Sequence, residues 1–329
     1  MAVHGHFAIN TYKQINFLFS EKLKMNALND RLYGCLFGLA CGDAVGTTVE
    51  FQARGTFEPL TDMLGRGPFD LQPGEWTDDT SMALCLGSSL VDCNGFDAED
   101  QMERYCRWHQ EGYLSSNGTC FDIGGTVQSA LRAYRFSGHP FAGSKDEFSA
   151  GNGSIMRLAP ISMFYSKLEE VVFYAAESSR TTHGADECIG ACQFLGAILH
   201  KAIRGVSKEE ILLGEYLSKD IKVQLPAKIE SIARGDYRDK LSSEIRGSGY
   251  VVDCLEAALW CFYQTTSFRE AVLCAANLGD DADTTAAVCG QIAGAYYGAA
   301  GIPPDWLARI AKSDLIESLI AGLIETRTK

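Results

Sequence analysis

Two short acidic segments carry the residues of this chain that are best suited to chemistry. Residues 74–80 have the sequence GEWTDDT, and residues 279–285 have the sequence GDDADTT. Each segment places carboxylates and threonine hydroxyls where a loop is predicted to become a helix. The N-terminus of a helix carries unpaired N–H groups and a partial positive charge, so single acids are common there. Several acids within a few residues exceed what a helix cap requires.

If the two segments meet in the fold, they form a cluster of oxygen ligands. Hard divalent cations such as Mg²⁺ or Mn²⁺ prefer such ligands, whereas Zn²⁺ favours nitrogen and sulfur. Four converging carboxylates would repel one another, and two divalent cations would balance their charge. The aspartates concerned are Asp78, Asp79, Asp281 and Asp283. Taken alone, each segment is more often an ordinary helix start than a metal site.

Two further acids lie near a glycine-spaced helix that ends in a turn at residues 34–46. Asp43 is expected to cap or brace this turn. Glu50 follows a loop of small residues and could reach a water at the site as a general base. An isolated glutamate is more often a surface residue, so the sequence leaves both roles of Glu50 open.

Glycine-rich loops supply candidate ligand contacts. Residues 122–126 (DIGGT) precede a predicted helix and either cap it or hold ribose hydroxyls. Residues 150–154 (AGNGS) offer backbone N–H groups that suit a phosphate, although such loops are weak evidence alone. His183, in a Thr-His-Gly turn, is more often a structural hydrogen-bonding residue than a catalyst.

Composition and missing motifs narrow the function classes. A net charge of −13 and a pI of about 4.9 argue against nucleic-acid and anionic-membrane partners. No segment approaches the ~20 apolar residues of a membrane span. The 12 cysteines include no CxxC pair, which favours reduced thiols and a cytoplasmic location. The absence of GxSxG, HExxH and Walker motifs argues against serine hydrolases, zincins and P-loop enzymes.

Helix-period patterns dominate the chain, and alternating strand patterns are nearly absent, so the sequence predicts an all-α domain. The helix after Thr284 is rich in glycine and alanine. Glycine within a helix costs about 1 kcal/mol relative to alanine, which predicts close packing against another helix. We divide the chain into an apolar, aromatic N-terminal arm at residues 1–27 and a catalytic domain at residues 28–329.

Taken in order, these segments resemble the ADP-ribosylglycohydrolase family, whose founding type is the dinitrogenase reductase-activating glycohydrolase. The resemblance runs from about Asn29 to about Gly301. It is carried by GCLFGLACGDAVGTTVEF, GEWTDDTSMAL, CFDIGGTVQSAL, GNGSIMRLAPI, TTHG and NLGDDADTTAAVCGQIAGAYYG.

The family resemblance implies an orthogonal helical fold with a binuclear Mg²⁺ centre, Mn²⁺ being the alternative. It implies that the metal ligands are Thr77, Asp78, Asp79, Asp281, Asp283 and Thr284. The residues implied to line the ADP-ribose cleft are Asp122, Gly124, Gly151, Asn152, Gly153, Ser154 and His183.

The implied activity is removal of ADP-ribose from modified protein side chains, most often arginine. Water held by the metals would attack the anomeric carbon, and Asp79 or Glu50 would handle the proton. The residues alone do not exclude another ADP-ribose linkage or another two-metal hydrolase such as a phosphodiesterase. The complete acid clusters argue against a relative that has lost catalysis.

Two departures from the family pattern bear on partners. Asp280 stands where many relatives have glycine, and the arm at residues 1–27 lies outside the family domain. Some relatives give immunity to ADP-ribosylating toxins, and an N-terminal extension there blocks the toxin. The alternative function is therefore occlusion of an ADP-ribosyltransferase toxin by this arm, although a helix docked on its own domain or a poorly ordered terminus is favoured. Equal toxin binding after deletion of residues 1–24 would refute the alternative.

Overall fold

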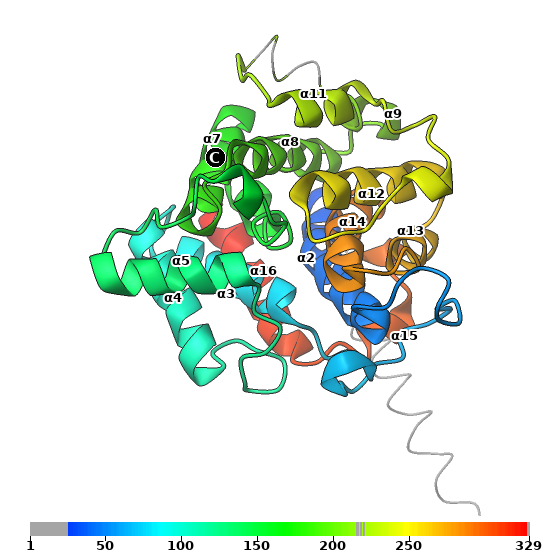
Figure 1. Ribbon diagram of the computed structural model, residues 1–329, viewed down its shortest axis with the longest axis horizontal. Helices are drawn as coiled ribbons and strands as arrows, with labels where there is room; N and C mark the ends of the chain where they lie inside the picture. Colours follow the sequence, from blue (N-terminus) through cyan, green and yellow to red (C-terminus); the bar gives the residue numbers. More distant parts are fainter. Residues whose placement is uncertain (1–25, 215–216, 218, 220, 328–329) are drawn as a thin grey trace, which may run out of the picture.

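The computed structural model describes residues 26–214, 217, 219 and 221–327, and those ranges form helices joined by loops, with three isolated bridges and no strand. The all-α prediction is confirmed for this part of the chain (Figure 1). Residues 1–25 of the predicted arm lie outside the described residues, so the arm stays a prediction.

The α-helices are α2 (Ala27–Gly46), α3 (Asp78–Asp92), α4 (Ala98–Glu111), α5 (Gly125–Ser137), α6 (Ala159–Phe164), α7 (Leu168–Thr182), α8 (Asp186–Ile203), α9 (Lys208–Ile211), α11 (Ala227–Arg234), α12 (Val251–Gln264), α13 (Phe268–Ala276), α14 (Ala282–Tyr297), α15 (Pro304–Leu307) and α16 (Ser313–Thr326). The 3-10 turns are η1 (Thr47–Val49), η2 (Gly67–Phe69), η3 (Glu147–Ser149), η4 (Ser242–Glu244) and η5 (Ala299–Gly301).

Helices α2 and α14 form the centre of the molecule and lie side by side (Figure 1). Glycines on α2 meet glycine and alanine backbone on α14, so the two helices approach closely. A Cβ atom on Gly38 would lie 2.2 Å from the carbonyl oxygen of Gly290, and one on Gly42 would lie 2.1 Å from that of Ala286. The predicted close packing of the small-residue helix is therefore confirmed, and α2 is its partner.

The burial of α2 also explains its apolar composition. Residues Ala27–Val49 are long and apolar enough to cross a membrane by length and composition alone, with 23 residues and a hydropathy of 1.3. The apolar window of this segment is 89% buried inside the protein, as expected of a core helix. The sequence-based statement that no segment approaches a membrane span was therefore too strong.

The packing of α2 against α14 is antiparallel, and this brings helix ends together. Gly34, early in α2, faces Gly294 near the end of α14, whereas Gly46 faces Ala282 at the start of α14. The C-terminal end of α2 therefore lies beside the N-terminus of α14. A smaller apolar cluster between α3, α4 and α5 includes Met82, Met102, Tyr105, Trp108 and Leu131, and it supports α3 as it approaches the same place.

Candidate metal centre

The two acidic segments meet at the N-termini of α3 and α14. The Thr284 hydroxyl donates a hydrogen bond of 3.1 Å to Asp79 Oδ1. The Thr77 hydroxyl oxygen lies 3.2 Å from Asp283 Oδ2. Both contacts join residues more than 200 positions apart in the chain, at separations of 205 and 206. The geometric condition on which the sequence-based metal-site hypothesis depends is thus met.

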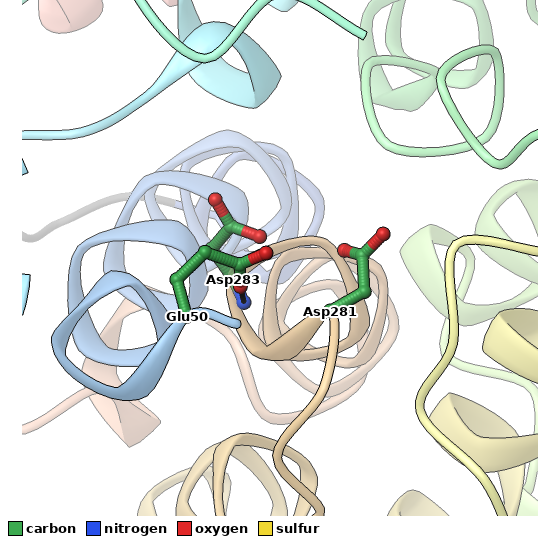
Figure 2. Close-up of side chains that lie close together, drawn as sticks. All are labelled: Glu50, Asp281 and Asp283. Carbon is green, nitrogen blue, oxygen red and sulfur yellow. Dashed lines mark hydrogen bonds between the residues drawn. The ribbon is translucent and has the colours of Figure 1, made fainter. Parts of the chain in front are cut away.

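Glu50 completes a cluster of three carboxylates with Asp281 and Asp283 (Figure 2). One oxygen from each of the three side chains lies within 4.8 Å of the others. Glu50 comes from the segment that follows α2 and η1, and its Oε2 accepts hydrogen bonds from the backbone N–H groups of Ala282 (2.7 Å) and Asp283 (3.1 Å). Glu50 is only 3% exposed, so it caps α14 from inside the protein and is not a surface residue.

Asp43 holds the start of α3. Its Oδ1 accepts from the backbone N–H (2.9 Å) and the hydroxyl (3.0 Å) of Thr77, and its Oδ2 accepts from the N–H (3.0 Å) and the hydroxyl (2.6 Å) of Thr80. Thr77 occupies the N-cap position but does not cap the helix with its own side chain. The sequence suggested that Asp43 braces its own turn, whereas it braces a helix 34 residues further along. Thr80 was not among the predicted site residues.

The buried side chain of Asp79 shows whether the residues of this site fit a metal ion. Its side chain is fully buried, and within the described residues its Oδ2 has no hydrogen-bond partner. A buried, unpartnered carboxylate oxygen is costly, and a cation would satisfy it. The surrounding donors are carboxylates and threonine hydroxyls, which is the oxygen-only set that Mg²⁺ and Mn²⁺ accept. The residues present therefore fit a hard divalent cation.

Burial and like charges act together on the carboxylates of this site. Burial, followed by the negative charges of Asp283 and Asp281, raises the pKa of Glu50 to about 12. Burial and neighbouring carboxylates raise the pKa values of Asp281 and Asp283 to about 7. The pKa of Asp79 lies well above its ordinary value for the same two reasons. Like charges crowded in a buried place disfavour ionisation, and a divalent cation reverses this effect.

Asp78 and Asp122 lie at the same cluster. Asp78 is 7% exposed, and burial followed by the charges of Asp122 and Asp283 raises its pKa well above the ordinary value. The Asp122 carboxyl interacts electrostatically with that of Asp283, and burial raises the pKa of Asp122 to about 6. Asp122 adopts a left-handed backbone conformation with φ 61°, which is uncommon for residues other than glycine.

The glycine-rich loop at residues 150–154 borders the acid cluster. The Asn152 amide donates a hydrogen bond of 3.2 Å to Asp281 Oδ2. Gly153 packs against His183, because a Cβ at Gly153 would lie 2.8 Å from His183 Cε1. Ser154 is buried, and its hydroxyl oxygen accepts a hydrogen bond from Ser179 (3.1 Å). The loop and His183 are thus close together, with Asn152 linking them to the acids.

A cavity of about 310 Å³ opens at the N-terminus of α5, lined in part by Gly125, Thr126, Ser144 and Ser149. Gly124 is the exposed N-cap of α5, and a Cβ there would meet nothing within 4 Å. The hydroxyl of Thr126 lies 3.7 Å from where a Cβ of Gly151 would sit, so the cavity adjoins the glycine-rich loop.

Asp280, the departure from the family pattern, is exposed and lies outside the carboxylate cluster. Its backbone N–H donates to the carbonyl of Gln52 (2.8 Å), and its carbonyl accepts from the N–H of Phe51 (2.8 Å). Asp280 therefore ties the start of α14 to the segment after Glu50 through its backbone.

Comparison with known proteins gives concordant results. The family model described as ADP-ribosylglycohydrolase matches residues 24–329. A protein of Serratia proteamaculans named ADP-ribosylarginine hydrolase Tri1 is 46% identical over 295 residues, covering 89% of this chain and 79% of that protein. The ADP-ribosyl-[dinitrogen reductase] glycohydrolase of Rhodospirillum rubrum is 32% identical, with 86% and 91% covered. A solved structure entitled ADP-ribosylglycohydrolase-related protein complex superposes with a TM-score of 0.82 at 39% identity, covering 92% of this chain and all of that one (100%).

Proposed function

Because the chain belongs to the ADP-ribosylglycohydrolase family, we propose that it hydrolyses the bond between ADP-ribose and a modified arginine side chain of a protein. Relatives from Serratia proteamaculans and Pseudomonas putida, both 46% identical, are named ADP-ribosylarginine hydrolases, which supports arginine as the linkage. The structural observation that carries the proposal is the cluster of Glu50, Asp281 and Asp283 facing the start of α3, in which Glu50 and Asp283 are buried and Asp281 is partly exposed.

Two Mg²⁺ ions are the proposed cofactors, with Mn²⁺ as the alternative. Bound cations of this kind orient substrate hydroxyls and lower the pKa of a coordinated water. The four aspartates among the proposed ligands would balance two divalent charges, and the unpartnered Oδ2 of Asp79 supports a ligand role for that residue. The proposed ligands are Thr77, Asp78, Asp79, Asp281, Asp283 and Thr284.

Glu50 is the proposed residue for proton transfer. One of its oxygens is fixed by two backbone N–H groups of α14, so the position of the side chain is defined. One of its carboxylate oxygens also lies within 4.8 Å of an oxygen of Asp283, so we propose a short path for a proton between the two groups. Burial of both side chains excludes bulk water from this path.

The rest of the proposed cleft binds and orients ADP-ribose. The proposed contact residues are Asp122, Gly124, Gly151, Asn152, Gly153, Ser154 and His183. The N–H groups of Gly151 and Asn152 are used by the carbonyls of Ser149 (2.9 Å) and Gly249 (3.0 Å). We therefore propose that the exposed N-terminus of α5 at Gly124 receives the diphosphate of a ligand that must approach a protein of net charge −13.

The proposal is tested by incubating the protein with an arginine-ADP-ribosylated target in the presence of Mg²⁺ and measuring released ADP-ribose. We expect release that stops when a chelator is added. Glu50→Gln should lower kcat by roughly 10²- to 10⁴-fold, as for loss of a general acid or base. Serine-linked ADP-ribose and ADP-ribose-1″-phosphate, assayed in parallel, define the linkage preference.

Asp280→Asn is the matched control, because it removes an exposed carboxylate from the same acidic segment without touching the cluster. Asparagine also tolerates the left-handed conformation of this position, where φ is 58°. Its activity should equal that of the wild-type protein. Label that remains on arginine with both Mg²⁺ and Mn²⁺ would contradict the proposed function.

A further inference from the structure

A guanidinium lies buried directly behind the glycine-rich loop. Arg157 is fully buried, and no carboxylate lies within ion-pair distance of it among the described residues. It donates hydrogen bonds to the carbonyl of Gly153 (2.7 Å) and to the hydroxyl of Thr182 (2.6 Å), and it stacks over the ring of Tyr105 at 4.8 Å. Burying a charged group costs desolvation free energy, and specific contacts such as these offset part of that cost.

The hydroxyl of Thr182 links this guanidinium to His183. Its oxygen accepts from Arg157 and lies 2.8 Å from His183 Nδ1. An arginine N–H can only donate, so the hydroxyl proton of Thr182 remains to be placed. If it points at Nδ1, the Thr182 hydroxyl and the His183 Nδ1 atom are both satisfied. If Nδ1 instead carried a proton, two donors would converge on one oxygen and the hydroxyl proton would have to find another acceptor. The first arrangement makes Nδ1 an acceptor.

With Nδ1 accepting, the neutral imidazole carries its proton on Nε2. Nε2 faces the glycine-rich loop: it lies 3.2 Å from where a Cβ of Gly153 would sit and 3.5 Å from that of Gly151. At position 153 a Cβ would crowd the ring, at 2.8 Å from Cε1, whereas at position 151 it would make an ordinary contact. Burial, followed by the positive charge of Arg157, lowers the pKa of His183 to about 3, so the ring remains neutral at physiological pH.

We propose that Arg157 and Thr182 are positioning residues that hold His183 as the Nε2–H tautomer, so that His183 donates a hydrogen bond to an oxygen of ADP-ribose bound along the glycine-rich loop. His183 is then a fixed donor and takes no part in acid–base catalysis. The identity of the ligand rests on the proposed function, whereas the tautomer does not.

The tautomer is measured by NMR on the full-length, ¹⁵N-labelled protein, using long-range correlations within the imidazole rings. The chain has 6 histidines, and loss of one set of signals in His183→Gln assigns His183. We expect an Nε2–H ring that does not titrate between pH 5 and pH 8. An Nδ1–H ring, or a midpoint within this pH range, would overturn the proposal without any activity assay.

The donor role is tested by calorimetry with free ADP-ribose in the presence of Mg²⁺. Thr182→Val removes the hydroxyl at nearly constant volume and should mix the tautomers and weaken binding roughly three- to tenfold, the equivalent of one hydrogen bond. Thr182→Ser keeps the hydroxyl and should restore both the tautomer and the affinity.

Unchanged tautomer and affinity in Thr182→Val would overturn the positioning role. If Thr182→Val does not fold, the wild-type spectrum and Thr182→Ser still decide the tautomer. A wild-type protein with the Nε2–H ring but no affinity for ADP-ribose would support the relay while refuting both the donor role toward this ligand and the proposed function.

Discussion

At the scale of single residues, Asp43 organises the proposed metal centre without belonging to the carboxylate cluster. Its two oxygens accept four hydrogen bonds from Thr77 and Thr80, and these residues flank Asp78 and Asp79. Asp43→Asn replaces one accepting oxygen by an NH₂ group, which leaves one backbone N–H without an acceptor. We expect about 1–3 kcal/mol of lost stability, the cost of a buried unsatisfied donor. Denaturant unfolding measures this loss, and calorimetric titration with Mg²⁺ should show weaker binding.

Thr80→Val tests the contribution of a single hydrogen bond to Asp43 while the side chain at position 80 stays buried. It removes one of the four hydrogen bonds but keeps the backbone N–H contact of residue 80 with Asp43. Its effects on stability and Mg²⁺ affinity should therefore be smaller than those of Asp43→Asn. An Asp43→Asn protein with wild-type Mg²⁺ affinity would show that the start of α3 holds its geometry without this carboxylate.

At the scale of elements, the contact between α2 and α14 sets the distance between the two halves of the site. Gly38→Ala tests it, because the added Cβ would lie 2.2 Å from the carbonyl oxygen of Gly290, a backbone atom that cannot rotate away. Alanine favours helix by about 1 kcal/mol, but overpacking a tight contact costs typically 1–3 kcal/mol and sometimes more. We expect net destabilisation in denaturant unfolding, together with weaker Mg²⁺ binding.

Gly125→Ala is the matched substitution in a helix with open surroundings. Position 125 begins α5, and a Cβ there would meet nothing within 4 Å. Stability should stay the same or rise by a few tenths of a kcal/mol. Equal losses from the two substitutions would mean that close approach of the helices does not explain the glycines of α2.

The elements that the sequence predicted are those whose signal is local. Helical periodicity predicted the all-α fold, and the glycines and alanines after Thr284 predicted a close helix contact. The acidic segments were recognisable because their charge exceeded the need of a helix cap. The contact between them could not be derived from spacing, because it depends on the antiparallel packing of α2 and α14.

Residues whose partners are distant in the chain were the ones that sequence reasoning placed poorly. Asp43 carries no local sign that it caps a helix 34 residues away. The relay from Arg157 to His183 is equally hidden, since an arginine in an apolar segment suggests neither burial nor a partner 25 residues further along. The order of family motifs supplied what local patterns could not.

At the scale of the whole molecule, the acid cluster makes stability depend on pH and on metal. The folded-state pKa values of Asp281 and Asp283 are about 7, above the ~3.9 expected for aspartate in the unfolded chain. The folded state therefore binds more protons than the unfolded state, and the metal-free protein loses stability as pH rises through 7. Buried His183 and His200 act in the opposite sense below pH ~6.5, because their folded pKa values are about 3.

Between pH 7 and pH 8 the histidines contribute little, because they are mostly neutral in the unfolded chain. Buried cysteines, whose pKa values are raised by burial, act in the same direction as the acids, so the difference between the wild-type protein and Asp283→Asn isolates the acids. In chelator, we expect the Tm by scanning calorimetry to fall between pH 7 and pH 8. Mg²⁺ at 100 times its Kd adds about 2.7 kcal/mol, on the order of 5 °C for a chain of this size. The gain at a fixed Mg²⁺ concentration should be larger at pH 8, because metal binding displaces protons from the carboxylates. Asp283→Asn should reduce both the fall in Tm with pH and the pH dependence of the Mg²⁺ gain, and Asp280→Asn should change neither. A metal-free Tm that rises from pH 7 to pH 8 would show that the cluster does not hold its protons.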